Sequence, residues 1–268
     1  ASDVYKRQHQ PKYYYFAWAN RLVTYYLKTS RTNIALYEVQ NMLKEAQKED
    51  DKTGLSRCYN IMSQIYTIKR FDSMAFEWRL KEIELTEKYN IENYNISQTY
   101  AQIANYYISQ KKQKEALRAV EKAISTANSS TQQISAKLEY VNYYSKFGDF
   151  QAAEKILKEC QIAFEQDKRL ESIKKRLYNI ECLYYQQTRQ YQKALEAAEM
   201  QEKEEHRLSE SILSSSHYRT QGEIYQKMGN MNMAVKYLQM YINTDDSLKI
   251  ANEQVASSEF ATLLNVEK

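Results

Sequence analysis

The sequence is poor in the residues that make turns, with four glycines and one proline among 268 residues. Average proteins contain about 7% glycine and about 5% proline, and sheet proteins use both in their many turns. The scarcity therefore favours long helices joined by short polar connections, and it argues against a β-sheet fold.

Long apolar segments are also lacking. The longest uninterrupted apolar run covers residues 13–19, whereas a membrane-spanning helix needs about 20 apolar residues. No charged segment followed by an apolar segment marks a secretory signal peptide. We therefore expect residues 1–268 not to insert into a membrane.

No strong charge of one sign is present. The formal net charge is +4, and acidic and basic residues alternate along most of the chain. Nucleic-acid-binding proteins usually concentrate their basic residues in a patch or stripe. The even distribution predicts a solvated surface, and we expect this segment not to bind nucleic acid.

The three cysteines, Cys58, Cys160 and Cys182, lie far apart. No Cys-x-x-Cys or Cys/His spacing suggests zinc, and an odd number of distant cysteines implies no disulfide framework. We interpret Cys160 and Cys182 as buried thiols that act as small apolar side chains.

Residues suited to catalysis are few. Glu202 and His206 lie four residues apart in a charged stretch, without a third metal ligand nearby. The sequence has no glycine-rich phosphate loop, no His-Glu-x-x-His motif and no Gly-x-Ser-x-Gly motif. We therefore expect no enzymatic activity, no catalytic residue, no metal site and no cofactor.

What the sequence does contain is a repeated pattern of alanine and tyrosine. Three alanines are separated by 41 and 40 residues, and each follows a tyrosine by nine residues; the pairs are Tyr144 with Ala153, Tyr185 with Ala194, and Tyr225 with Ala234. A fourth pair, Tyr107 with Ala116, lies 37 residues upstream. Small residues allow two helices to approach closely, and a neighbouring ring fills the remaining space. The pattern predicts antiparallel helix pairs, in which Gly148 and Gly229 end first helices with a positive φ.

This pattern resembles the tetratricopeptide repeat, whose signature combines a small residue, a tyrosine, a turn and a later alanine. The resemblance is strongest at 134–160, 175–201 and 215–241, is weaker at 97–123, and extends to helix pairs at 13–48 and 54–86. The register of the pair at 54–86 stays open, because either Ile65, Phe71 and Met74 or Tyr66 and Ala75 fit the motif positions.

The resemblance implies an all-α, right-handed superhelical solenoid of about six helix pairs, each of roughly 40 residues, with a C-terminal capping helix. We expect residues 1–12 to be a disordered or artefactual tail and residues 13–246 to form the repeat domain. Residues 247–268 are expected to form a capping or linker helix of a truncated chain, with apolar residues such as Phe260 covering the last repeat.

In tetratricopeptide proteins the first helices of the pairs line a concave face that binds peptides. The resemblance places these residues there: Gln98, Asn105, Asn142, Arg176, Asn179, Arg219, Glu223 and Gln226. It assigns Leu138 to the same face. Asparagine amides can donate to and accept from a peptide backbone, and arginine can hold a carboxylate through two bonds. The alternative is that these are ordinary solvent-facing polar residues.

We expect a non-enzymatic peptide- or protein-binding domain. The long, tyrosine-rich repeats look like the sensory segment of bacterial transmembrane regulators, which favours the periplasmic face of a membrane-anchored protein over the cytoplasm. In that case a membrane span is expected after Lys268. The alternative is a cytosolic tetratricopeptide scaffold or peptide-responsive regulator that mediates protein–protein interaction.

Overall fold

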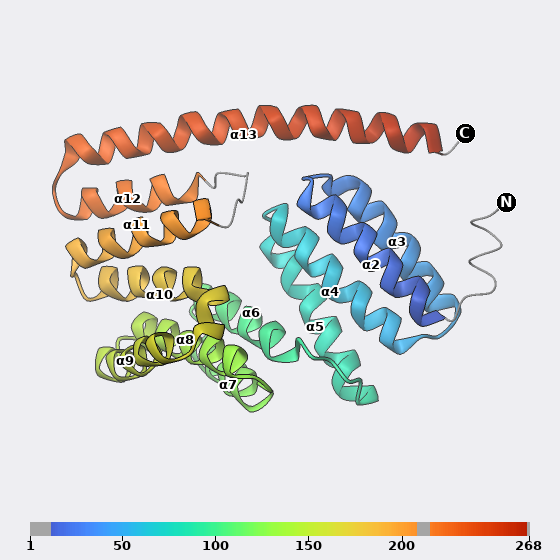
Figure 1. The fold of residues 1–268 in the computed structure, drawn as a ribbon, viewed down its shortest axis with the longest axis horizontal. Helices are drawn as coiled ribbons and strands as arrows, with labels where there is room; N and C mark the ends of the chain where they lie inside the picture. The colour runs from blue at the N-terminus through green and yellow to red at the C-terminus, as the bar shows by residue number, and fades with distance from the viewer. Residues whose placement is uncertain (1–11, 208–214, 267–268) are drawn as a thin grey trace. The chain divides into compact units, whose positions relative to one another are not determined.

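The structure is a computed structural model that describes residues 12–207 and 215–266, and these residues form helices and short connections without a strand (Figure 1). The helices are α2 (Lys12–Lys28), α3 (Thr32–Lys48), α4 (Lys52–Ile68), α5 (Asp72–Tyr89), α6 (Ile96–Ser109), α7 (Gln113–Ser125), α8 (Ser130–Phe147), α9 (Phe150–Gln166), the short 3-10 helix η1 (Lys168–Ile173), α10 (Lys174–Gln187), α11 (Tyr191–Arg207), α12 (Ser216–Lys227) and α13 (Met231–Val266). The expected tail lies outside the described residues, apart from Lys12, which begins α2.

Consecutive helices form six antiparallel pairs, and the tyrosine–alanine pattern occurs in all of them. The alanine that follows the tyrosine by nine residues is at most 2% exposed in every pair; these are Ala35, Ala75, Ala116, Ala153, Ala194 and Ala234. A small side chain at this position lets the second helix approach the first closely. The predicted all-α fold of about six helix pairs is confirmed.

The tyrosines also share a backbone contact at the turn between the two helices. In each pair the carbonyl of the tyrosine accepts a hydrogen bond from the residue five positions later; the tyrosines are Tyr26, Tyr66, Tyr107, Tyr144, Tyr185 and Tyr225. The residue before that donor has a positive φ, as expected at the C-terminal end of a helix. Gly148 (φ 91°) and Gly229 (φ 78°) occupy this position as predicted, and Ser30, Arg70, Lys111 and Arg189 occupy it elsewhere.

The structure also resolves the open register of the pair at 54–86. Ala75 is completely buried, whereas Met74 is 41% exposed. The amide of Phe71 donates to the carbonyl of Tyr66 at 2.9 Å. Tyr66 and Ala75 therefore hold the motif positions.

The chain divides into two compact units. Unit 1 contains α2 to α5 and the residues of α13 from Lys249 onward. Its core is built from α2, α3 and α4, with buried residues such as Val39, Met42 and Ile65, and Trp78 of α5 packs against it.

Unit 2 extends from Tyr94 to Leu248 and contains α6 to α12 and the first half of α13. Leu138, Leu157 and Ile180 belong to one buried cluster that joins α8, α9 and α10. A second cluster joins α10, α11 and α12 through Cys182, Leu195 and Ile224. Within unit 2, each repeat thus packs on the next one in the sequence, as in other solenoids.

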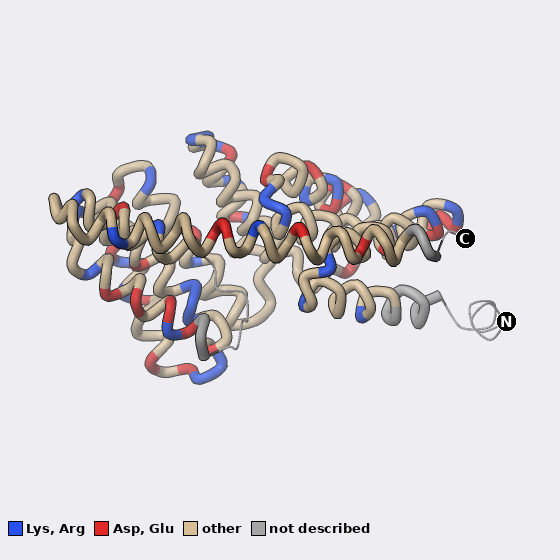
Figure 2. Tube along the Cα trace, turned by 90° about the horizontal axis from the view of Figure 1, so that it is seen from above, with Lys and Arg blue, Asp and Glu red and all other residues tan. Residues whose placement is uncertain are grey.

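The segment expected as a separate capping helix is continuous with the second helix of the last pair, since α13 runs without interruption from Met231 to Val266. The expectation that Phe260 would cover apolar surface is wrong, because its side chain is 58% exposed. Charged residues of both signs are interleaved along the helices (Figure 2). Among the described residues, no helix combines the length and the apolar character needed to cross a membrane.

Candidate functional site: an asparagine-lined groove in unit 2

Three successive first helices of unit 2 line a groove of about 510 Å³. The lining residues come from α6 (Asn105), α8 (Glu139, Asn142), η1 (Ser172, Ile173), α10 (Lys175, Arg176, Asn179, Ile180, Leu183) and α11 (Gln201). We call this site the asparagine groove. Its volume lies within the range of about 300–1,000 Å³ that is typical of ligand sites.

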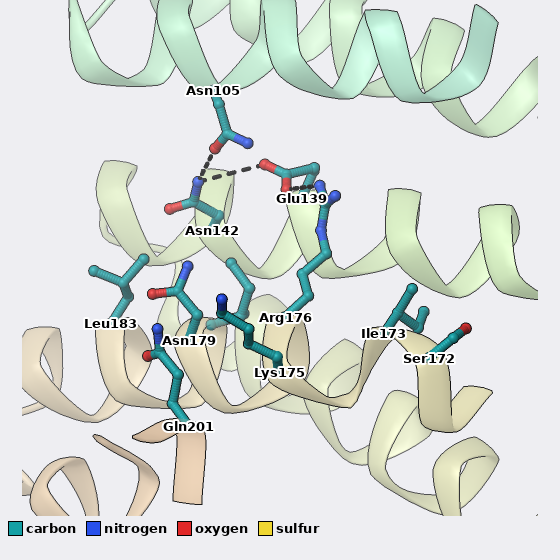
Figure 3. Close-up of a pocket in the computed structure, with 11 residues that line it drawn as sticks. Asn105, Glu139, Asn142, Ser172, Ile173, Lys175, Arg176, Asn179, Leu183 and Gln201 are labelled. Carbon is teal, nitrogen blue, oxygen red and sulfur yellow. Dashed lines mark hydrogen bonds and ion pairs between the residues drawn. The ribbon is translucent and has the colours of Figure 1, made fainter. Parts of the chain in front are cut away.

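Three asparagines, one from each of α6, α8 and α10, lie in the groove (Figure 3). The Nδ2 atom of Asn142 donates a hydrogen bond to Oδ1 of Asn105 at 2.7 Å. Asn105 and Asn142 occupy equivalent positions of their repeats, whereas Asn179 lies one helical turn before the equivalent residue, Leu183. A primary amide carries two donor hydrogens and two acceptor lone pairs. This single bond between the amides of Asn105 and Asn142 therefore leaves both with capacity for a ligand.

A buried carboxylate lies beside the asparagines. Glu139 is 1% exposed and forms an ion pair with Arg176 of α10. Its Oε2 atom also accepts a long hydrogen bond of 3.5 Å from Nδ2 of Asn142. The Nε atom of Arg176 is buried, and it has no hydrogen-bond partner among the described residues. Glu139 and Arg176 therefore neutralise each other within the groove lining.

Four of the predicted site residues thus come together: Asn105, Asn142, Arg176 and Asn179 all line the groove. Sequence reasoning missed Glu139 and instead assigned its neighbour Leu138, which is fully buried in the core. The cause is the fixed set of groove positions taken from the repeat family, which in α8 falls one residue before Glu139. A usable signal was present, because Glu139 precedes Asn142 by three residues, as Arg176 precedes Asn179, and such residues share one helix face.

The other four predicted residues, Gln98, Arg219, Glu223 and Gln226, do not line this groove and stay predictions. Arg219 Nε donates to Oε1 of Glu223 at 2.8 Å, and the two side chains are 60% and 44% exposed. Both arginines that were expected to hold a ligand carboxylate are therefore already paired with carboxylates of the chain itself.

The cysteines and histidines bring no further chemistry to the groove. Cys58, Cys160 and Cys182 are free and buried, as the sequence predicted for Cys160 and Cys182. Glu202 lies 3.3 Å from Nε2 of the buried His217, while the side chain of His206 is outside the described residues. In the part of the chain that the structure describes, no group of three His, Cys, Asp or Glu residues could hold a metal ion.

The helix pairs, the turn geometry that recurs in all six pairs and the groove on the first helices define a tetratricopeptide-like solenoid. No protein-family model and no curated protein matches the sequence.

Solved structures, by contrast, resemble the fold clearly. The apo form of RapI superposes with a TM-score of 0.69 at 14% identity, covering 92% of this chain and 89% of that chain. A Rap protein in complex with competence and sporulation factor superposes with a TM-score of 0.61 at 15% identity, covering 94% of this chain and 74% of that chain. PilW, a type IV pilus biogenesis factor, superposes with a TM-score of 0.52 at 16% identity, covering 85% of this chain and 93% of that chain. At such identities the likeness shows the fold alone.

Proposed function

We propose that the asparagine groove binds an extended peptide or a protein segment, and that the protein acts without catalysis. The observation that carries this proposal is the convergence of Asn105, Asn142 and Asn179, from three different helices, on one groove. An extended backbone presents donors and acceptors at regular intervals, and side-chain amides supply both. The Rap protein that was solved with competence and sporulation factor shares the fold, which supports a ligand-binding role for this architecture.

The charges of the groove limit the kind of ligand. Arg176 is occupied by Glu139, so a ligand carboxylate must compete with a buried internal partner. Backbone contacts to the asparagines compete with two neutral-amide donations of Asn142, one to Asn105 and a long one to Glu139. The groove therefore suits a ligand that is recognised mainly through its main chain.

For the biological role we propose the ligand-sensing part of a bacterial signalling regulator, on the periplasmic face of a membrane. The second candidate is a cytosolic scaffold or a peptide-responsive regulator, which the likeness to Rap proteins supports. The residues encoded after Lys268 distinguish the two roles. An apolar span of about 20 residues supports the sensor, and a polar continuation or a stop codon supports the cytosolic protein.

Peptide binding is tested with a random heptapeptide display library. Peptides are selected on the protein, and their affinities are then measured for wild type and for Asn142→Ala. Loss of a ligand hydrogen bond should weaken binding about tenfold, equivalent to ~1.4 kcal/mol. Asn243→Ala is the matched control, since Asn243 is exposed on α13 outside the groove, and it should leave affinity unchanged. Failure to enrich any peptide over an unrelated helical protein contradicts the proposal, as does equal binding to Asn142→Ala.

A further inference from the structure

Near its C-terminal end, α13 buries a charged residue and exposes an aromatic one. Glu259 is 3% exposed, whereas its neighbour Phe260 is 58% exposed. Charged side chains are seldom buried unless they are paired. The position of Glu259 therefore calls for a specific partner.

That partner is the N-terminal end of α3. Oε1 of Glu259 accepts hydrogen bonds from the backbone amides of Asn33 at 3.1 Å and Ile34 at 3.2 Å. Its Oε2 atom accepts from Nδ2 of Asn33 at 2.7 Å. The first amides of a helix have no partner within the helix, and the helix dipole favours a negative charge beside them. The residue that precedes α3, Arg31, makes no side-chain cap, so Glu259 caps a helix that is more than 220 residues away in sequence.

A lysine holds the side chain of Asn33 in place for this contact. Lys69 Nζ donates to Oδ1 of Asn33 at 2.7 Å. This bond fixes the orientation of the Asn33 amide, so that its Nδ2 atom faces Glu259. All these residues belong to unit 1, which contains α3, α4 and the end of α13.

The remainder of this part of α13 contributes little buried surface. Between residues 249 and 263, Glu259 is the only buried side chain, and most of its neighbours are exposed. Apolar burial stabilises a contact in proportion to area, and here that area is small. The three hydrogen bonds to one carboxylate therefore contribute much of the attachment of the end of α13.

We propose that Glu259 is a releasable latch, which holds the last turns of α13 against the first repeat through the N-terminal end of α3. Capture of the carboxylate by another cation or amide donor releases the helix end. Contacts of this kind, with few apolar neighbours, open at a low cost in free energy.

Glu259→Gln tests the latch with minimal change in shape. A glutamine oxygen can replace Oε1, but its Nε2 atom then faces Nδ2 of Asn33, donor against donor. Turning the Asn33 amide would place Nδ2 against the ammonium of Lys69. Hydrogen exchange, measured by mass spectrometry on the full chain, should become about tenfold faster both at the start of α3 and across residues 249–263.

Glu253→Gln is the matched control, because Glu253 lies on the same helix and is exposed. Its exchange should equal that of wild type. The proposal is overturned if Glu259→Gln speeds exchange only at the start of α3, since Glu259 would then be a local cap. Unchanged exchange in Glu259→Gln, or equal effects of the two variants, also overturns it.

A second variant covers the case in which Glu259→Gln fails to fold. Asn33→Ala removes the Nδ2 bond but keeps both backbone bonds to the carboxylate. It should speed exchange in the same two segments by a smaller factor, while α6 to α10 exchange as in wild type. Wild-type exchange across residues 249–263 in Asn33→Ala contradicts the latch.

Discussion

Arg176 on α10 forms an ion pair with Glu139 on α8, and the carboxylate lies almost entirely out of contact with solvent, with 1% of its side chain exposed. Arg176 keeps 25% of its side chain exposed at the groove. The ion pair thus joins two successive repeats beside the asparagines of the groove. Removing one partner of such a pair leaves an uncompensated buried charge.

Arg176→Ala should destabilise the protein by about 3 kcal/mol, at the lower end of the range for buried pairs because Arg176 is partly solvated. Glu139→Gln in the same chain should restore part of this loss, since no buried charge then remains. Urea unfolding monitored by circular dichroism measures both effects.

Lys137 and Glu159 provide a control pair with N and O atoms 3.0 Å apart and side chains 41% and 46% exposed. Lys137→Ala should cost less than about 1 kcal/mol, as is usual for solvated pairs. Glu139→Gln is also measured alone. If the losses in free energy of unfolding of the two single variants add up to that of the double variant, the two side chains are not coupled.

Glu181 makes stability depend on pH. Burial raises the pKa of its carboxyl group, although Gln161, which donates to Oε1 at 2.7 Å, offsets part of the effect. A raised pKa in the folded state gives stability that is complete below the ordinary value of 4.5 and is lost as the pH rises through the folded value. Glu181→Gln should therefore raise the urea midpoint at neutral pH and match wild type below about pH 4.5.

Glu165→Gln serves as the control for this pH series, because Glu165 is exposed on α9. Its stability should follow that of wild type at each pH. A midpoint for Glu181→Gln that is lower than wild type at neutral pH would contradict the assignment.

The three thiols should be inert in the folded protein. Burial raises the pKa of Cys58 to about 12 and that of Cys160 to about 11, and it also raises the pKa of Cys182. Since the thiolate is the reactive form, Ellman's reagent should label none of them in native buffer at mildly alkaline pH. All three cysteines of the sequence should react in concentrated guanidinium chloride. Rapid labelling of a native thiol would show that its helix pair opens.

The helix-pair architecture could be predicted from sequence because it depends on local spacing. A tyrosine and an alanine nine residues apart fix both the turn and the close approach of two helices, and all six such alanines are buried. The pair at 54–86 showed the limit of this reasoning. Only packing distinguished Ala75 from Met74, because both lie within one turn and both are apolar.

The polar contacts between distant residues could not be predicted in the same way. The contact between Asn33 and Glu259 joins residues 226 positions apart, and no local pattern links them. Glu139 was missed for a different reason, since the groove position taken from the repeat family falls on its neighbour Leu138, and only the packing shows that Leu138 is buried in the core. The closeness of Asn105 and Asn142 could be predicted, because the spacing of 37 residues between them equals the local repeat, as the alanines Ala116 and Ala153 show.

The central claim, that the asparagine groove is the ligand site, is tested most directly by site-specific photocrosslinking. Benzoylphenylalanine is placed at Leu183, which lines the groove and is 37% exposed, or at Ile162 on α9, which is 52% exposed outside it. A biotinylated peptide selected from the heptapeptide library should crosslink at position 183 and not at position 162, and excess unlabelled peptide should abolish the product. Crosslinking at position 162 without crosslinking at position 183 would contradict the account.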